Sequence, residues 1–291
     1  MNNRTDLALE AAADSAELDE NDLQQHRHTA DGVTVCRTVV CSRRAAERLQ
    51  KPCGRYVTVE LPPLSDDEKQ LCTQAEQVSR ELAALLPAAG TVLVVGLGNR
   101  TVTPDTLGPA TADMVLATRH IRGEFARAAG LDDLRPTAVL TPGVLGQTGT
   151  ESCEIVRGVC REVEPAAVIV IDALAARSPQ RLGCTVQLCD TGIAPGSGVG
   201  NDRRPLNREG LGVPVIGLGV PTVVDAATLV QAYQPAPEPA APTDAAAAMM
   251  VTPREIDLVI SRAARLLAMG INRVLQPAYS PLELIAIAKG I

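Results

Sequence analysis

Two aspartates are the residues whose types and positions best suit chemistry. Asp105 follows the apolar run 91–95 and a glycine-rich turn, and Asp172 directly follows the apolar run 167–171. The carboxyl ends of parallel strands meet at one edge of a sheet, where ligands usually bind, so these side chains can meet across a crevice. Proximity pushes the pKa values of two carboxyl groups apart, so one can act as base and the other as acid on a bound water. The alternative interpretation is that each aspartate caps a helix or accepts hydrogen bonds from loop amides.

Gly96 and Gly98 invite a dinucleotide-binding interpretation, but the rest of that motif is absent. Thr101 stands where the third glycine is needed, and Pro104 delays the following helix. No second strand ending in an acidic residue follows about 20 residues later, where it would bind a ribose. A non-enzymatic nucleotide- or metal-binding module is therefore the weaker alternative, and the turn is better explained as a support for Asp105.

Serine and cysteine nucleophiles have weaker support. Ser197 lies in a Gly-Ser-Gly run, but Pro195 stands where an esterase elbow needs its first glycine. The chain has only three histidines to serve as a base. Cys153 lies early in a predicted helix, where the helix dipole lowers a thiol pKa, and Cys160 follows two turns later. We interpret both cysteines as small buried side chains.

The composition limits both the core and the partners. Hydrophobic residues make up 46% of the 291, yet there is one Phe, three Tyr and no Trp. The core must therefore consist of aliphatic side chains, which suits helices packed on a parallel sheet. Few aromatics and a net charge of -7 argue against nucleic-acid binding. Eight cysteines without a C-x-x-C pair, no apolar signal segment and no long apolar run predict a cytoplasmic protein that does not span a membrane.

Strand and helix patterns alternate from residue 66 to 270, which predicts an α/β fold. We expect a helix–sheet–helix sandwich with a mostly parallel central sheet and a single domain over 32–291. Residues 1–31 are predicted to be flexible, and the Pro/Ala-rich run 234–248 to be a connection. The predicted strands are 33–40, 56–59, 91–95, 138–140, 167–171, 185–188 and 213–220, and the predicted helices are 65–86, 109–120, 150–164, 222–230, 252–269 and 281–288.

Many segments, in matching order, resemble the spore germination protease family. Its members are atypical aspartic endopeptidases that degrade small acid-soluble spore proteins. The segments cover most of residues 4–228 and extend beyond them. The resembling runs are 4–10, 95–99, 102–109, 118–120, 141–146, 171–178, 190–201, 219–226 and 251–257.

The resemblance implies a fold related to the hydrogenase-maturation peptidases, a homotetramer located in the forespore or spore core, and Asp105 and Asp172 as the catalytic pair. It also implies a zymogen that removes its own N-terminal segment, about 1–10, by cutting the bond between Glu10 and Ala11. The family carries a longer insertion where this chain has 234–249. Loop residues expected to line the substrate cleft are Gly96, Gly98, Asn99, Gly143, Gly146, Gly196, Ser197 and Gly198.

His120 and Glu151 are the side chains that could turn the aspartate pair into a metal site. A histidine at a helix end is more often a partner of the helix dipole, and the cysteine spacing does not indicate zinc. We therefore expect no metal or other cofactor. A metal-assisted peptidase of the hydrogenase-maturation type stays as the alternative enzyme.

Overall fold

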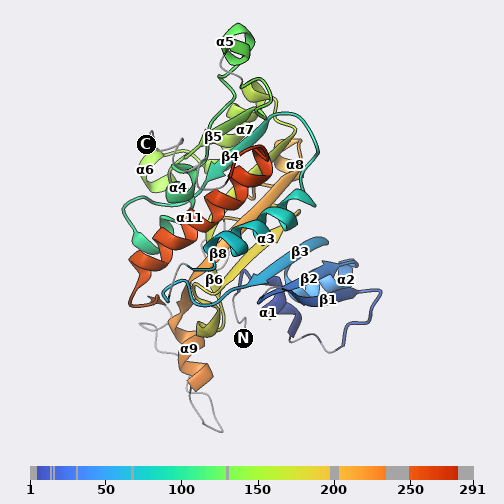
Figure 1. The fold of residues 1–291 in the computed structure, drawn as a ribbon. Helices are drawn as coiled ribbons and strands as arrows, with labels where there is room; N and C mark the ends of the chain where they lie inside the picture. Colours follow the sequence, from blue (N-terminus) through green and yellow to red (C-terminus); the bar gives the residue numbers. More distant parts are fainter. Residues whose placement is uncertain are drawn as a thin grey trace.

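The computed structural model describes residues 5–13, 15, 17–30, 32–66, 69–128, 131–196, 203–233 and 249–280. Within these residues one sheet of nine strands runs through the molecule in the order β1-β2-β3-β7-β8-β6-β4-β5, and β9 pairs with β8 (Figure 1). The strands are β1 Leu23–Ala30, β2 Val33–Val40, β3 Gly54–Glu60, β4 Val92–Gly96, β5 Thr137–Leu140, β6 Ala167–Ala176, β7 Thr185–Cys189, β8 Val215–Asp225 and β9 Met250–Val251.

The expected α/β class with a central sheet is confirmed, and the sheet has a parallel and an antiparallel half. Strands β5, β4, β6 and β8 are parallel neighbours, and they include both strands that precede the candidate aspartates. From β8 through β7, β3 and β2 to β1 every pairing is antiparallel. The apolar pattern predicted strands on this side but did not reveal their direction.

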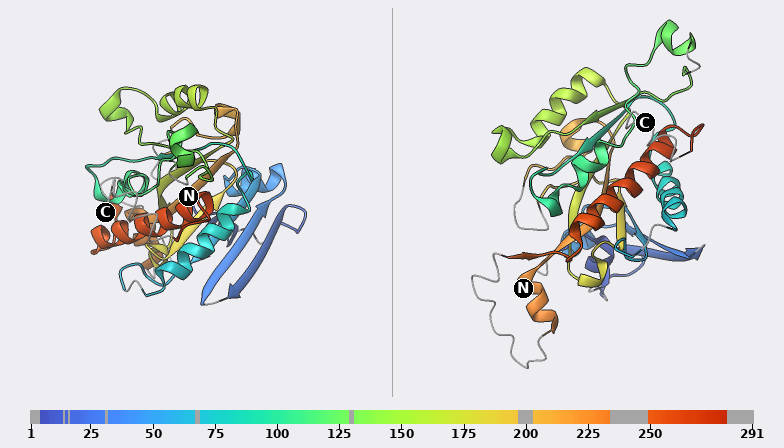
Figure 2. Two further views of the ribbon diagram at one scale, coloured as in Figure 1. Left: turned by 45° about the horizontal axis from the view of Figure 1, so that its top comes forward. Right: turned by 60° about the vertical axis from the view of Figure 1, so that its left-hand side comes forward.

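Helices cover both faces of the parallel half. In β6, Ile169 and Ile171 pack in a cluster with α3, α4 and α11, whereas Val168 and Val170 pack with α7 and α8. Alternate residues of a strand point to opposite faces, so the two helix groups form the outer layers of a sandwich. Figure 2 shows α3 and α11 side by side on one face. The helices are α1 Ala8–Ala13, α2 Arg43–Leu49, α3 Leu71–Ala83, α4 Leu107–Ala112, α5 Gly123–Ala128, α6 Leu145–Thr148, α7 Ser152–Val163, α8 Arg208–Leu211, α9 Ala226–Tyr233 and α11 Ile256–Leu275, with short 3₁₀ turns η1 Thr103–Asp105 and η2 Pro179–Arg181.

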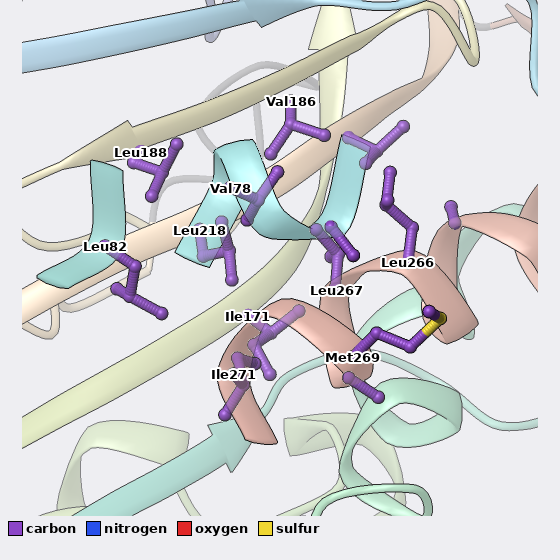
Figure 3. Close-up of a cluster of buried hydrophobic side chains, with 14 of the residues drawn as sticks. Val78, Leu82, Ile171, Val186, Leu188, Leu218, Leu266, Leu267, Met269 and Ile271 are labelled. Atoms are coloured by element: carbon purple, nitrogen blue, oxygen red, sulfur yellow. The ribbon is translucent and has the colours of Figure 1, made fainter. Parts of the chain in front are cut away.

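The main core lies between the sheet and the pair α3 and α11. Figure 3 shows Val78 and Leu82 of α3 facing Leu267 and Ile271 of α11. The helix predicted over 252–269 does not end there, because α11 continues through Gly270 to Leu275. A Cβ at Gly270 would lie 3.1 Å from Val78 Cγ1. The glycine therefore serves close packing between two helices.

The N-terminal region is more regular than its composition indicated. We expected residues 1–31 to be flexible, but the described part includes α1 and β1. Leu7 and Ala8 have no exposed surface. Ala8 packs with residues of α2, β2 and β3 in a small separate cluster. Figure 1 shows α1 near α2 and the antiparallel strands β1 and β2. Contacts with distant parts of the chain order this segment, and local sequence patterns cannot reveal such contacts.

Several predicted boundaries shift. The helix predicted over 65–86 begins at Leu71, and the one predicted over 109–120 ends at Ala112. The short α2 was not predicted. The predicted connection 234–248 and the predicted helix 281–288 lie outside the described residues. No helix in the described part of the chain is long and apolar enough to cross a membrane.

Candidate active site

Asp105 is held by a turn that requires glycine. Strand β4 ends at Gly96, and the chain bends back through Gly98 before the short η1. Gly98 has φ +123°, and a Cβ there would lie 1.9 Å from the main-chain oxygen of Asp105. The Asn99 N–H donates a 2.8 Å hydrogen bond to Asp105 Oδ2. The turn thus fixes the carboxylate at the carboxyl end of β4.

Asp172 lies within a strand. The prediction that β6 ends at Ile171 is wrong, because the strand continues to Ala176 and pairs with β8 beyond this point. The side chain of Asp172 is 6% exposed, and its Oδ1 accepts the Ala173 N–H at 3.0 Å. A carboxyl group is therefore buried in the middle of the sheet, which is costly for its charged form.

Burial shifts the pKa values of both aspartates upward. Desolvation raises the pKa of Asp172 well above its usual range, and the negative charges of Asp105 and Asp6 raise it further. Desolvation also raises the pKa of Asp105, but the hydrogen bond from Asn99 opposes this shift. The upward shift is greater for Asp172, so the two carboxyl groups differ in how readily they ionise.

A cavity of about 820 Å³ contains both aspartates. Of the expected loop residues, five line it, namely Gly98, Asn99, Gly143, Gly146 and Gly196. Gly96 is not among the lining residues, because it faces α4, where a Cβ would lie 2.3 Å from Gly108 O. Ser197 and Gly198 lie outside the described residues.

The cavity is also lined by polar residues that the sequence analysis did not single out. Asp6, Lys51, Gln187 and Arg203 line it, and each comes from a different part of the chain. Lys51 Nζ donates to the Thr5 carbonyl at 2.9 Å. Burial lowers the pKa of Lys51, while the negative charge of Asp6 opposes the shift. The spacing of these four cavity residues in the sequence does not predict a site, because only the folded chain brings them together.

The expected cleavage bond does not line this cavity. Glu10 and Ala11 belong to α1, and Glu10 is 6% exposed. The Glu10 carboxylate accepts the N–H groups of Arg177 at 2.7 Å and Ser178 at 2.9 Å. Among the described residues 5–10 of the N-terminal segment, Asp6 lines the cavity with the aspartates.

The two candidate metal ligands lie in different places. His120 is exposed and does not line the cavity, and the neighbouring Arg119 N–H donates to Thr137 O at the start of β5. Glu151 does line the cavity, with Oε1 3.8 Å from Arg203 Nη1. Across the described ranges no group of three or more His, Cys, Asp or Glu residues has the geometry to hold a metal ion.

The two cysteines considered as nucleophiles are small buried side chains, as we expected. Cys153 and Cys160 are buried in α7 against the sheet. Burial raises the pKa of the Cys160 thiol, which disfavours the reactive thiolate. All eight cysteines are free thiols.

Comparison with known proteins places the chain in a family. The germination protease family profile matches residues 3–233. A germination protease of Caldanaerobacter subterraneus subsp. tengcongensis is 38% identical, with 97% of this chain and 96% of the relative aligned. One from Clostridium acetobutylicum is 35% identical, with 97% of each chain aligned. One from Bacillus velezensis is 43% identical over 78% of this chain and 64% of the relative.

Among solved structures, the [NiFe] hydrogenase maturation protease HycI from Thermococcus kodakarensis is similar with a TM-score of 0.39 and 18% identity. The superposition covers 67% of this chain and 99% of HycI. This likeness is too weak to carry an argument, so the assignment depends on the family match and the sequence identities. They show that this chain belongs to the germination protease family and is a protease of spore germination.

Proposed function

We propose that the protein is an aspartic-type endopeptidase that begins the degradation of small acid-soluble spore proteins in the germinating spore. The observation that carries this proposal is the pair Asp105 and Asp172 in one cavity, with pKa values raised to different extents. A water between the carboxyl groups is the nucleophile. The cavity is large enough for a peptide segment, since pockets of about 300–1,000 Å³ suit organic ligands.

The chemistry follows from the two environments. Asp105, ionised, accepts a proton from the water while the water oxygen bonds to the peptide carbonyl carbon. Asp172, protonated, gives its proton to the amine nitrogen as the carbon–nitrogen bond breaks. The products are a free carboxyl end and a free amino end, with the protonation of the pair reversed. General acid–base catalysis of this kind contributes about 10²–10⁴-fold to a rate.

The loops at 141–149 and 190–196 support substrate binding. Gly143, Gly146 and Gly196 lie on the cavity wall, where main-chain amides can bind an extended peptide. A homotetramer in the forespore or spore core, and a protease domain over 32–291 preceded by a pro-segment, belong to the same proposal. They follow from the family resemblance.

A small acid-soluble spore protein should be cut when it is incubated with the purified protein, and mass spectrometry of the fragments provides the readout. Cleavage should survive a strong chelator in a preparation shown to be metal-free, because both proposed catalytic groups are carboxyl groups. Loss of cleavage on chelation, with recovery on adding back a divalent metal, would favour the metal-assisted alternative, in which Glu151 would join the two aspartates.

Self-cleavage is the second expected activity. We predict that incubation of the full chain releases the N-terminal segment and yields a new end at Ala11, as measured by intact mass and N-terminal sequencing. The bond lies inside α1, so the helix must unwind before cleavage. A new end at Leu7 would instead identify the bond after Asp6, which lines the cavity. A chain that stays intact under conditions that cleave added substrate would contradict the zymogen part of the proposal.

A further inference from the structure

The chain around Lys51 is fixed on both sides of this residue. Helix α2 ends and Gln50 follows with φ 53°, a left-handed conformation that strains a residue with a side chain. The Lys51 N–H donates to Ala46 O at 3.1 Å. The hydroxyl of Tyr56 donates to Pro52 O at 2.8 Å. This strained turn therefore holds Lys51 in place on the wall of the cavity that contains the aspartate pair.

The ammonium group of Lys51 binds a peptide carbonyl oxygen. Its Nζ donates to the Thr5 main-chain oxygen at 2.9 Å. That oxygen belongs to the peptide bond between Thr5 and Asp6, and Asp6 lines the cavity. The negative charge of Asp6 raises the pKa of Asp172, so the two carboxyl groups are close enough to interact. Lys51 thus binds the chemical group that a peptidase must polarise, beside the cavity of the aspartate pair.

The proposed peptidase chemistry creates a negative charge that the two aspartates do not stabilise. When a water oxygen bonds to the carbonyl carbon, one electron pair of the carbon–oxygen double bond moves onto the oxygen. That pair returns when the carbon–nitrogen bond breaks and the amine leaves. A cation or N–H donor fixed beside this oxygen stabilises the transition state, because the negative charge develops there. Carboxyl groups cannot supply a positive charge, so another side chain must do so.

Two side chains on the cavity wall carry positive charge, among the residues that the structure describes: Lys51 and Arg203. The Arg203 guanidinium lies 3.8 Å from the carboxylate of Glu151, which offsets its charge. Lys51 instead binds a neutral oxygen, and the charge of Asp6 acts on it from a greater distance. Once Thr5 has left, the ammonium group has a donor to offer, and an entering peptide carbonyl can accept it.

We propose that Lys51 binds the carbonyl oxygen of the scissile peptide bond and stabilises the oxyanion that forms on it. The proposal rests on the proposed peptidase function and adds a third catalytic group to the aspartate pair. Lys51 keeps its proton throughout, so the two carboxyl groups carry out both proton transfers. A carbonyl of the chain's own N-terminal segment binds Lys51 in this structure, and a substrate carbonyl takes its place once the segment has left.

The kinetics of Lys51→Met test this role. Methionine is similar in length but has no N–H donor, so kcat on a small acid-soluble spore protein should fall about 10²–10³-fold, while KM changes less than about threefold. Self-release of the N-terminal segment should slow by a similar factor, and kcat is compared between chains that intact mass shows to have the same N-terminal end. A folded Lys51→Met with the wild-type kcat, whether or not KM rises, overturns the proposal.

The matched control is Lys69→Met, at an exposed lysine that does not line the cavity. It should keep the wild-type kcat, and Tm measured on each preparation shows that the variants are folded. If Lys51→Met does not fold, Lys51→Gln replaces it. Glutamine keeps a neutral N–H donor but loses the charge, so its kcat should be at least about tenfold below wild type. Wild-type kcat in the glutamine variant overturns the proposal.

Lys51→Arg tests whether the positive charge is the property that matters. The guanidinium group keeps the charge and the N–H donors in a different shape, so kcat should recover in part, at least about tenfold above Lys51→Met. Arginine and methionine variants with equally low kcat overturn the oxyanion role, because the loss would then not depend on the charge.

Asp105→Asn, assayed on the same substrate, separates this proposal from the proposed function. If wild type cleaves, Asp105→Asn does not and Lys51→Met cleaves at the wild-type rate, the role of Lys51 is overturned and the aspartate pair stands. If wild type leaves the substrate intact, the proposed function and the role of Lys51 are both overturned.

Discussion

Asp172→Asn is expected to lose at least about 10³-fold in cleavage rate while gaining stability at neutral pH. The loss follows because asparagine cannot donate the proton that the departing amine requires. The gain follows because burial and the charges of Asp105 and Asp6 make the ionised form of Asp172 unfavourable in the folded state. Each unit by which the folded pKa exceeds the unfolded value costs about 1.4 kcal/mol once the group is ionised.

The sign of the pH dependence makes this prediction specific. When the pKa of a carboxyl group is higher in the folded than in the unfolded state, the group does not lower the free energy of unfolding at pH values below its unfolded pKa. The free energy of unfolding then falls progressively as the pH rises toward the folded pKa. The Tm advantage of Asp172→Asn over wild type should therefore be present at pH 7 and disappear near pH 4. Asp113→Asn, at an exposed carboxylate paired with Arg100, is the control and should show neither effect. A variant less stable than wild type at pH 7 would mean that the charge of Asp172 supports the fold.

Gly98→Ala is expected to cost about 2–4 kcal/mol of stability and about 10²-fold in cleavage rate. The added methyl would overlap the Asp105 carbonyl, and the backbone at φ +123° disfavours any side chain. The turn must open to relieve the overlap, which moves the Asp105 carboxylate away from Asn99 and from Asp172. Urea unfolding and a cleavage assay on the same preparation measure the two effects.

Gly212→Ala separates backbone strain from the displacement of Asp105. Gly212 also has positive φ, at +78°, but a Cβ there meets no atom within 4 Å. The free energy of unfolding of this control should fall by about 1 kcal/mol, and its cleavage rate should equal that of wild type. If Gly98→Ala behaved like Gly212→Ala in both measurements, the turn would not be positioning the catalytic carboxylate.

The central part of the site could be predicted from the sequence because it depends on local patterns. The apolar runs before Asp105 and Asp172 form the adjacent parallel strands β4 and β6. Gly96 at the end of β4 pairs with Ile171 of β6, so Asp172 lies level with the end of β4 although β6 itself continues to Ala176. The glycines of the first turn were also informative, since Gly98 is required by the backbone that carries Asp105.

The rest of the site depends on contacts between distant segments. The length of β6 beyond Asp172 was missed because residues 173–176 are mainly alanine, which has little strand preference. Pairing with β8 and with Asp6 stabilises that extension. Likewise, Lys51 and Gln187 become functional candidates only because the N-terminal segment folds back across the sheet. The spacing of residues in the sequence does not predict that the N-terminal segment packs on the sheet.

The cleavage rate of Asp105→Asn on a small acid-soluble spore protein tests the central claim most directly. Wild type, Asp105→Asn and the exposed control Asp113→Asn are compared under single-turnover conditions, with Tm measured on each preparation. The aspartate pair predicts a folded Asp105→Asn that is at least about 10³-fold slower than wild type, and an Asp113→Asn at the wild-type rate. A folded Asp105→Asn that cleaves the substrate as fast as wild type would contradict the aspartate pair as the catalytic machinery.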